Sequence, residues 1–132
     1  MKIGILDDDL VICGMLRELL ELTEHEAAVY NNPWDLLMIL FNNDPPIRIF
    51  DALIVDILLP DLLGSQVIQQ IRAHFADLPI VVISALPGET LDTIRSRFPT
   101  LAVLKKPFAL KDLLGALEAA CGQVQEVSPP VS

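Results

Sequence analysis

Basic residues are scarce in this chain of 132 residues. Nine lysines and arginines stand against 18 aspartates and glutamates, so the formal net charge is −9 at pH 7. Binding to nucleic acid depends on a basic surface that neutralises phosphates, and docking onto an anionic membrane needs the same sign of charge. The composition therefore argues against both functions. It favours a cation, or a partner protein with a basic face, as the binding partner.

Cysteines and long apolar runs are also few. Cys13 and Cys121 are far apart and form no Cys-x-x-Cys pair, so a metal finger or a thioredoxin-like redox site has no support. The longest apolar run, Leu36 to Phe41, has six residues, whereas a membrane-spanning helix needs about 20. The segment before Asp7 is too short for a signal peptide. We therefore expect a soluble, cytoplasmic protein whose two thiols are reduced.

The chain contains enough apolar material for one domain. Hydrophobic residues make up 52% of it, which excludes a disordered chain. A domain of this length buries roughly two-thirds of the surface that its unfolded chain exposes. We expect one domain over residues 1–121, with Gly122 ending its last helix. Residues 122–132, which include two adjacent prolines, are expected to form a flexible tail or the start of a truncated linker.

Short apolar runs alternate with amphipathic segments throughout the domain. The runs predict buried strands, and the amphipathic segments predict helices. The predicted strands span residues 3–6, 27–30, 51–56, 79–84 and 101–104. The predicted helices span residues 10–23, 33–41, 65–75, 89–98 and 109–121. This succession of strand–helix units predicts an α/β fold, with helices on both faces of a doubly wound parallel sheet.

Four of the predicted strands end in polar residues, and the carboxyl edge of such a sheet is where ligands bind. Several carboxylates placed together repel one another unless a hard divalent cation such as Mg²⁺ lies among them. Mg²⁺ and a lysine together neutralise phosphoryl oxygens, and a nearby carboxylate can accept the phosphoryl group as an acyl phosphate. The residues concerned are Asp7, Asp8, Asp9, Asp56, Ser84, Lys105 and Lys106.

Five short motifs, in this order, resemble the receiver domain of two-component response regulators. They are Ile5-Leu6-Asp7-Asp8-Asp9, Asp51-Ala52-Leu53-Ile54-Val55-Asp56, Leu59-Pro60 with Gly64, Ser84-Ala85, and Lys106-Pro107-Phe108. Each motif alone is a weak signal, and it is their order on successive strand–helix units that carries the resemblance. The resemblance covers roughly residues 1–121. It implies a five-stranded sheet of flavodoxin-like order 2-1-3-4-5 and a signalling function activated by phosphorylation.

The resemblance also implies a role for each residue of the site. Asp56 would accept a phosphoryl group from the phosphohistidine of a sensor histidine kinase or a phosphotransfer protein. Lys106 would pair with that group, and Ser84 would supply the hydroxyl that moves to bond it. The Lys106–Pro107 peptide would be cis. Mg²⁺ would be the cofactor, and its protein ligands would be Asp7, Asp8, Asp56 and the main-chain carbonyl of Leu58.

In the family, phosphorylation switches the face formed by the fourth helix, the fifth strand and the fifth helix. The resemblance therefore implies that this face binds an output domain, a partner protein, or a second receiver in a homodimer. The chain is expected to catalyse only its own phosphorylation and dephosphorylation, so it is not expected to be an enzyme acting on other substrates. No contact of this domain with nucleic acid or membrane is expected.

Three positions depart from the family in ways that bear on function. Val103 stands where many relatives have an aromatic residue that swings between two positions, so the switch is expected to act without that movement. Leu58 and Leu86 stand where relatives often carry polar side chains that orient the hydrolytic water. Because leucines cannot orient water and can obstruct it, we expect a long-lived phosphoryl state.

Two other interpretations of the sequence remain. The run Asp7-Asp8-Asp9-Leu10-Val11 also fits the motif of haloacid-dehalogenase-like phosphatases, with Asp7 as nucleophile and Asp9 as acid. That interpretation leaves Asp56 without a role, and it lacks the later acids that hold Mg²⁺ in those enzymes. In the receiver interpretation, Asp9 instead caps the helix that follows it. The second alternative is a degenerate receiver that acts only as an interaction module, which the complete set of site residues argues against.

Overall fold

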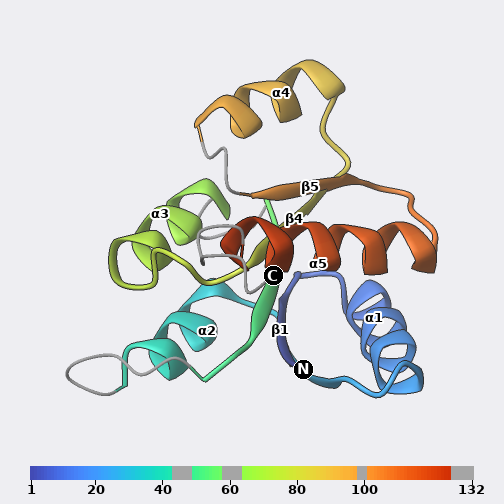
Figure 1. Cartoon of the computed structure of the whole chain (residues 1–132). Helices are drawn as coiled ribbons and strands as arrows, with labels where there is room; N and C mark the ends of the chain where they lie inside the picture. The colour runs from blue at the N-terminus through green and yellow to red at the C-terminus, as the bar shows by residue number, and fades with distance from the viewer. Residues whose placement is uncertain (43–48, 58–63, 98–100, 126–132) are drawn as a thin grey trace, which may run out of the picture.

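The structure, a computed structural model, describes residues 1–42, 49–57, 64–97 and 101–125. Strands and helices alternate along the chain (Figure 1). The strands are β1 (Lys2–Leu6), β2 (Glu26–Tyr30), β3 (Ala52–Asp56), β4 (Ile80–Ser84) and β5 (Ala102–Lys105). The helices are α1 (Leu10–Leu22), α2 (Pro33–Leu40), α3 (Gly64–His74), α4 (Gly88–Arg97) and α5 (Leu110–Gln125). Each element lies within a few residues of its predicted range.

The strands form one parallel sheet in the order β2-β1-β3-β4-β5, which confirms the predicted fold class. The register of the sheet brings the carboxyl ends of β3, β4 and β5 close together. Asp56 at the end of β3 pairs with Ile83 of β4, and Ser84 pairs with Lys105 at the end of β5. Side chains that follow these strands therefore meet at one edge of the sheet.

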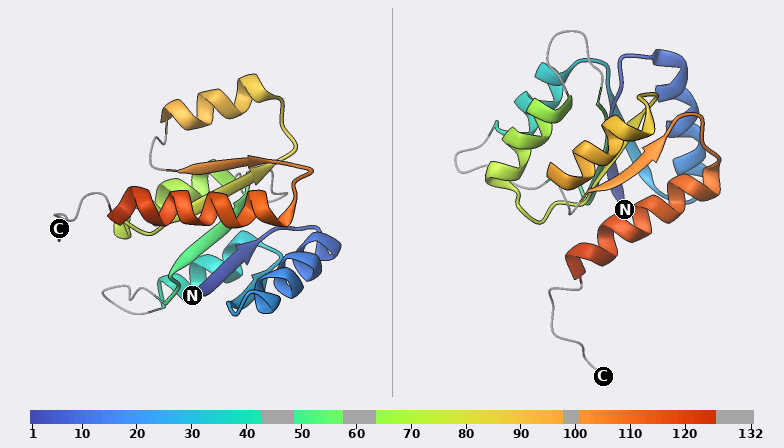
Figure 2. Two further views of the ribbon diagram at one scale, coloured as in Figure 1. Left: turned by 45° about the vertical axis from the view of Figure 1, so that its right-hand side comes forward. Right: turned by 90° about the horizontal axis from the view of Figure 1, so that it is seen from above.

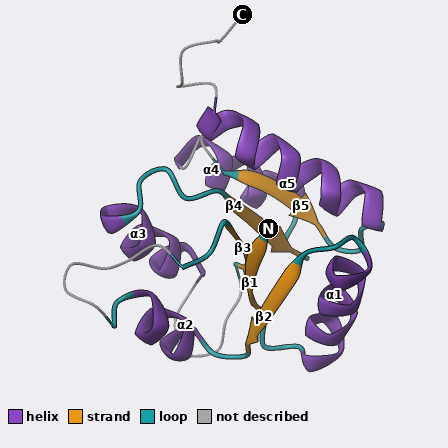
Figure 3. Ribbon diagram, turned by 60° about the horizontal axis from the view of Figure 1, so that its bottom comes forward, coloured by secondary structure: helices purple, strands orange, loops and turns teal. Residues whose placement is uncertain are grey.

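Two hydrophobic clusters fill the space between the sheet and its helices. Strand β3 contributes Leu53 and Val55 to one cluster, and Ala52 and Ile54 to the other, because successive side chains of a strand point to opposite faces. Helices α2 and α3 pack on the first cluster, and α1 and α5 on the second. Figures 2 and 3 show these two pairs of helices on opposite sides of the sheet.

The starts of the first two helices follow from their capping residues. The Asp9 carboxylate accepts hydrogen bonds from the amides of Val11 and Ile12, at 3.0 and 3.3 Å. It is therefore the N-cap of α1, as predicted. Asn32 caps α2 in the same way, and Pro33 occupies the first turn, where its missing N–H costs nothing.

The end of α5 corrects one expectation. Gly122 was predicted to end this helix, but α5 continues through Gly122 to Gln125. A glycine inside a helix costs only about 1 kcal/mol relative to alanine, so it does not stop a helix by itself. The rest of the predicted tail, residues 126–132, lies outside the described residues. Among those described, no helix is long and apolar enough to cross a membrane.

Candidate functional site

Three acids from two neighbouring strands meet at the carboxyl edge of the sheet. One carboxylate oxygen from each of Asp7, Asp8 and Asp56 lies within 4.8 Å of the other two. Asp7 is fully buried, Asp56 is 6% exposed, and Asp8 is exposed. The acids therefore form a cluster with a buried base and one side open to solvent. The structure thus brings together the three predicted metal-ligating carboxylates, while Leu58, whose carbonyl was predicted to join them, lies outside the described residues.

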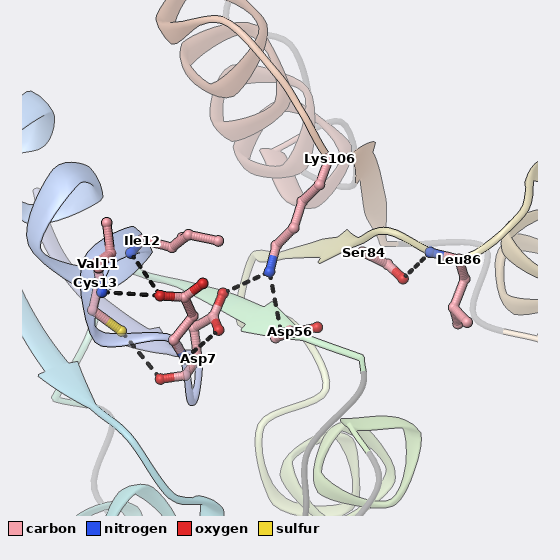
Figure 4. Close-up of polar contacts among 9 residues, drawn as sticks. Asp7, Val11, Ile12, Cys13, Asp56, Ser84, Leu86 and Lys106 are labelled. Carbon is pink, nitrogen blue, oxygen red and sulfur yellow. Dashed lines mark hydrogen bonds and ion pairs between the residues drawn. The ribbon is translucent and has the colours of Figure 1, made fainter.

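Lys106 reaches this cluster from the turn after β5. Its Nζ donates hydrogen bonds to Asp7 Oδ2 at 2.9 Å and to Asp56 Oδ2 at 3.2 Å (Figure 4). Burial by itself lowers the pKa of Lys106, but the hydrogen bond to Asp7 and the charges of Asp56 and Asp7 outweigh it and raise the pKa above its ordinary value. The side chain is therefore an ammonium at neutral pH. The Lys106–Pro107 peptide is cis, as the resemblance implied.

Each oxygen of Asp7 accepts a hydrogen bond from a different group. Lys106 donates to Oδ2, the Asp9 amide donates to Oδ1 at 2.9 Å, and the Cys13 thiol donates to the main-chain carbonyl at 3.1 Å. Burial, together with the nearby charge of Asp7, raises the pKa of Cys13 to about 11, so the thiol keeps the proton that it donates. Residue types alone do not indicate this contact, because it depends on how α1 turns back over the end of β1.

Ser84 is fully buried at the end of β4. Its main-chain carbonyl accepts a hydrogen bond from the Lys106 amide at 2.7 Å, and its Oγ accepts one from the Leu86 amide at 2.9 Å. In Figure 4 the Ser84 hydroxyl points toward Leu86 and away from Asp56. The backbone thus places Ser84 beside the site, while its hydroxyl is held by the turn that follows β4.

Leu86 lies differently from our expectation. We expected its side chain to stand beside the phosphoryl site and obstruct water. Instead it packs against the α2–α3 hydrophobic cluster, on which Ile94 and Val103 also pack. Figure 4 shows it directed away from the Asp56 carboxylate. The reason is physical: a leucine gains more by removing apolar surface from water in the core than by lying beside carboxylates.

The charges and atoms of the acid cluster fit a divalent cation. Its three carboxylates and the one ammonium leave two negative charges in a small volume. Every ligand offered is an oxygen, which is the ligand type that Mg²⁺ prefers, and water can complete the shell on the side of Asp8. Ser84 and Lys105, in contrast, offer nothing to the cluster in this arrangement, because the Ser84 hydroxyl faces Leu86 and Lys105 is exposed.

Comparisons with known proteins agree with this architecture. Residues 3–118 match the family described as response regulator receiver domain. The response regulator MprA of Mycobacterium leprae (strain TN) is 32% identical over 124 residues, which covers 90% of this chain and 50% of that protein. The chain thus spans about half the length of the curated relatives it matches.

Solved structures show the same fold. A CheY-like response regulator receiver domain protein from Methanospirillum hungatei JF-1 superposes with a TM-score of 0.80 at 18% identity, covering 96% of this chain and 98% of that one. A sensor protein from Polaromonas sp. JS666 also gives 0.80, at 27% identity over 93% of this chain and 97% of that one.

Proposed function

This chain belongs to the response regulator receiver domain family, and on that basis we propose that Asp56 is a phosphoacceptor whose modification switches the domain between two states. The observation that carries the proposal is the position of Lys106, whose ammonium bridges the carboxylates of Asp7 and Asp56. A nucleophilic carboxylate, a fixed cation and a second acidic group at one sheet edge are the components that phosphoryl transfer to an aspartate needs.

The proposed reaction places a phosphoryl group on Asp56. A carboxylate oxygen of Asp56 attacks the phosphorus of a phosphohistidine, the P–N bond breaks, and the electron pair stays with the imidazole nitrogen of the donor. The product is an acyl phosphate. Lys106 is already 3.2 Å from Asp56 Oδ2, so its ammonium can pair with the oxygens of the transferred group with little movement. The chain's own chemistry is limited to gaining and losing this group.

Mg²⁺ is the proposed cofactor. Asp7, Asp8 and Asp56 would hold it, and the resemblance implies the main-chain carbonyl of Leu58 as a further ligand. When bound, the ion neutralises charge on the phosphoryl oxygens. The Asp9 amide holds Oδ1 of Asp7, so this oxygen is oriented before any ligand arrives. Such preorganisation lowers the cost of binding.

The phosphohistidine donor is proposed to dock on α1. Apolar side chains at the start of this helix face solvent directly beside the acids: Leu10, Val11 and Met15 are exposed, Val11 by 80%. An adjoining cavity of about 520 Å³ is lined by Ile12, Met15, Ala85, Lys106, Pro107 and Phe108. Exposed apolar surface of this kind marks sites of protein contact. A sensor histidine kinase or phosphotransfer protein docked here would bring its phosphohistidine to Asp56.

The output of the switch is proposed to pass through α4. To reach a phosphoryl group on Asp56, the Ser84 hydroxyl has to turn away from the Leu86 amide that it now contacts. Leu86 and the α4 residue Ile94 pack against the same hydrophobic cluster, and Leu91 is the buried apolar side chain of α4. Because Leu86 and Ile94 share this cluster, a shift of Leu86 can change the position of α4. An output domain, a partner protein or a second receiver would read the α4–β5–α5 face.

Labelling with acetyl phosphate and Mg²⁺ tests the proposal. Intact-mass measurement should show one phosphoryl group on the wild type and none on Asp56→Ala. A haloacid-dehalogenase-like phosphatase would give the opposite pattern, with labelling lost in Asp7→Ala and kept in Asp56→Ala. A degenerate receiver would give no labelled species, and beryllofluoride with Mg²⁺ would leave the amide resonances around Ser84 unchanged. Either of these results contradicts the proposed function.

A further inference from the structure

Gly64, the first residue of α3, lies directly against the end of β3. Its amide donates a hydrogen bond to the Ile57 carbonyl at 2.9 Å. A Cβ placed on Gly64 would lie 2.5 Å from the main-chain oxygen of Asp56 and 2.5 Å from Ile57 Cα. Ordinary contact to a Cβ begins at 3.4 Å, so any side chain here would force the two backbones apart by almost 1 Å.

We propose that Gly64 is a positioning residue for Asp56. By having no side chain, it lets α3 begin close enough to β3 to hold the Asp56 carboxylate at the acid cluster. This inference rests on the proposed function, because it assigns Gly64 to the same site. Backbone conformation does not explain the glycine, since no described glycine has a positive φ. What the position requires is space.

The packing of α3 determines whether the helix or the end of β3 would move. Val67, Ile68 and Ile71 are fully buried in the hydrophobic cluster and fix the helix against the sheet. The central strand β3, in contrast, ends here: Asp56 is its last residue in register with β4, and beyond it the Ile57 amide donates a longer hydrogen bond, 3.2 Å, to the Ile83 carbonyl. A side chain at position 64 would therefore displace Asp56 and Ile57 more easily than it would displace α3.

A displacement of this size matters at the acid cluster. The Asp56 carboxylate is 3.2 Å from Lys106 Nζ and within 4.8 Å of its two acidic neighbours. Hydrogen bonds weaken steeply beyond about 3.5 Å, and a misplacement of about 1 Å in a reacting group can cost about 100-fold in rate. Both Mg²⁺ binding and phosphorylation depend on this carboxylate, so both should decline together.

Gly88 provides a matched control. It is the first residue of α4, as Gly64 is of α3, and it follows the neighbouring strand β4. A Cβ built on Gly88 meets nothing within 4 Å, and the same is true of Gly14 and Gly115 inside α1 and α5. Alanine at these positions should be tolerated, and at Gly14 and Gly115 it should stabilise the helices.

The experiment compares Gly64→Ala with Gly88→Ala and the wild type. For each protein, calorimetric titration gives the Mg²⁺ dissociation constant. Acetyl phosphate labelling gives the maximal rate and the half-saturating concentration, and circular dichroism checks the fold. We expect Gly64→Ala to be folded, to bind Mg²⁺ at least 10-fold more weakly, and to lose at least 10-fold in maximal labelling rate. Gly88→Ala should stay within twofold of the wild type in both quantities.

The outcomes separate this inference from the proposed function. If the wild type is not labelled, the proposed function fails, whatever Gly64→Ala does. If the wild type is labelled and a folded Gly64→Ala matches it within twofold, the inference is overturned. If Gly64→Ala does not fold, it is repeated together with Gly14→Ala and Gly115→Ala. Failure to fold in that stabilised background would also overturn the inference, because it would assign Gly64 to the fold and not to the site.

Discussion

The Lys106 ammonium lies 2.9 Å from Asp7 Oδ2, although the two residues are 99 positions apart in the chain. The same ammonium also contacts Asp56 Oδ2 at 3.2 Å, so it bridges two acids that lie at the ends of the neighbouring strands β1 and β3. A divalent cation bound by the same acids would have to share their oxygens with this ammonium. Lys106 should therefore oppose Mg²⁺ binding while it supports phosphoryl transfer.

Substituting Lys106 separates these two effects. In Lys106→Met the ammonium is removed, so Mg²⁺ should bind at least about 5-fold more tightly, because two like unit charges about 4 Å apart repel each other by about 1 kcal/mol even in water. The rate of labelling by acetyl phosphate should fall, because no fixed cation pairs with the phosphoryl oxygens. Lys105→Met is the control: Lys105 is exposed, so both quantities should stay at the wild-type level. Weaker Mg²⁺ binding in Lys106→Met would contradict the competition.

The buried thiol of Cys13 predicts a loss of stability in alkali. Burial, assisted by the charge of Asp7, raises its pKa from 9.0 to about 11. Above pH 9 the unfolded chain releases this proton while the folded chain keeps it, so stability present below pH 9 is lost as the pH rises toward 11. A shift of this size corresponds to on the order of 3 kcal/mol.

Urea unfolding between pH 8 and pH 11 measures this effect. The free energy of unfolding should fall more steeply with pH in the wild type than in Cys13→Ala, which has no thiol at this position. Cys121→Ala is the control, because Cys121 is only half-buried and Cys13 remains in that variant. Parallel slopes for the wild type and Cys13→Ala would show that the thiol does not titrate as the structure requires.

The lifetime of the phosphoryl group tests the expectation for Leu58. A leucine at this position cannot orient a hydrolytic water, so Leu58→Asn should shorten the lifetime several-fold, measured as decay of the labelled protein after removal of acetyl phosphate. Leu86 packs against the core, so Leu86→Asn should mainly lower stability. Equal or slower decay in Leu58→Asn would count against a long-lived phosphoryl state set by this residue.

Much of the fold and of the site could be predicted because both depend on local patterns. Apolar runs and capping residues such as Asp9 define the strands and helices, and a parallel sheet brings the ends of its strands to one edge. Contacts set by packing could not be predicted. The direction of the Leu86 side chain, the bond from Cys13 to Asp7 and the close approach at Gly64 all depend on distances between elements, which residue types do not reveal.

Leu86 connects Ser84 with α4. The Leu86 amide contacts the Ser84 hydroxyl, while its side chain lies on the cluster that also supports Ile94 of α4. Movement of the hydroxyl should therefore reach α4 through Leu86. In the wild type, beryllofluoride with Mg²⁺ should shift amide resonances both around Ser84 and Lys106 and along α4.

Truncating one side chain should uncouple these two groups of resonances. In Leu86→Ala, the shifts around Ser84 and Lys106 should persist, because the main-chain amide and the acids remain. The shifts along α4 should shrink at least twofold, because the side chain that links residue 86 to the cluster is gone. Val103→Ala removes a different apolar side chain from the same cluster and should keep the α4 shifts. If Leu86→Ala keeps them in full, or Val103→Ala loses them equally, then Leu86 is not the link, and the signal reaches α4 through the cluster as a whole.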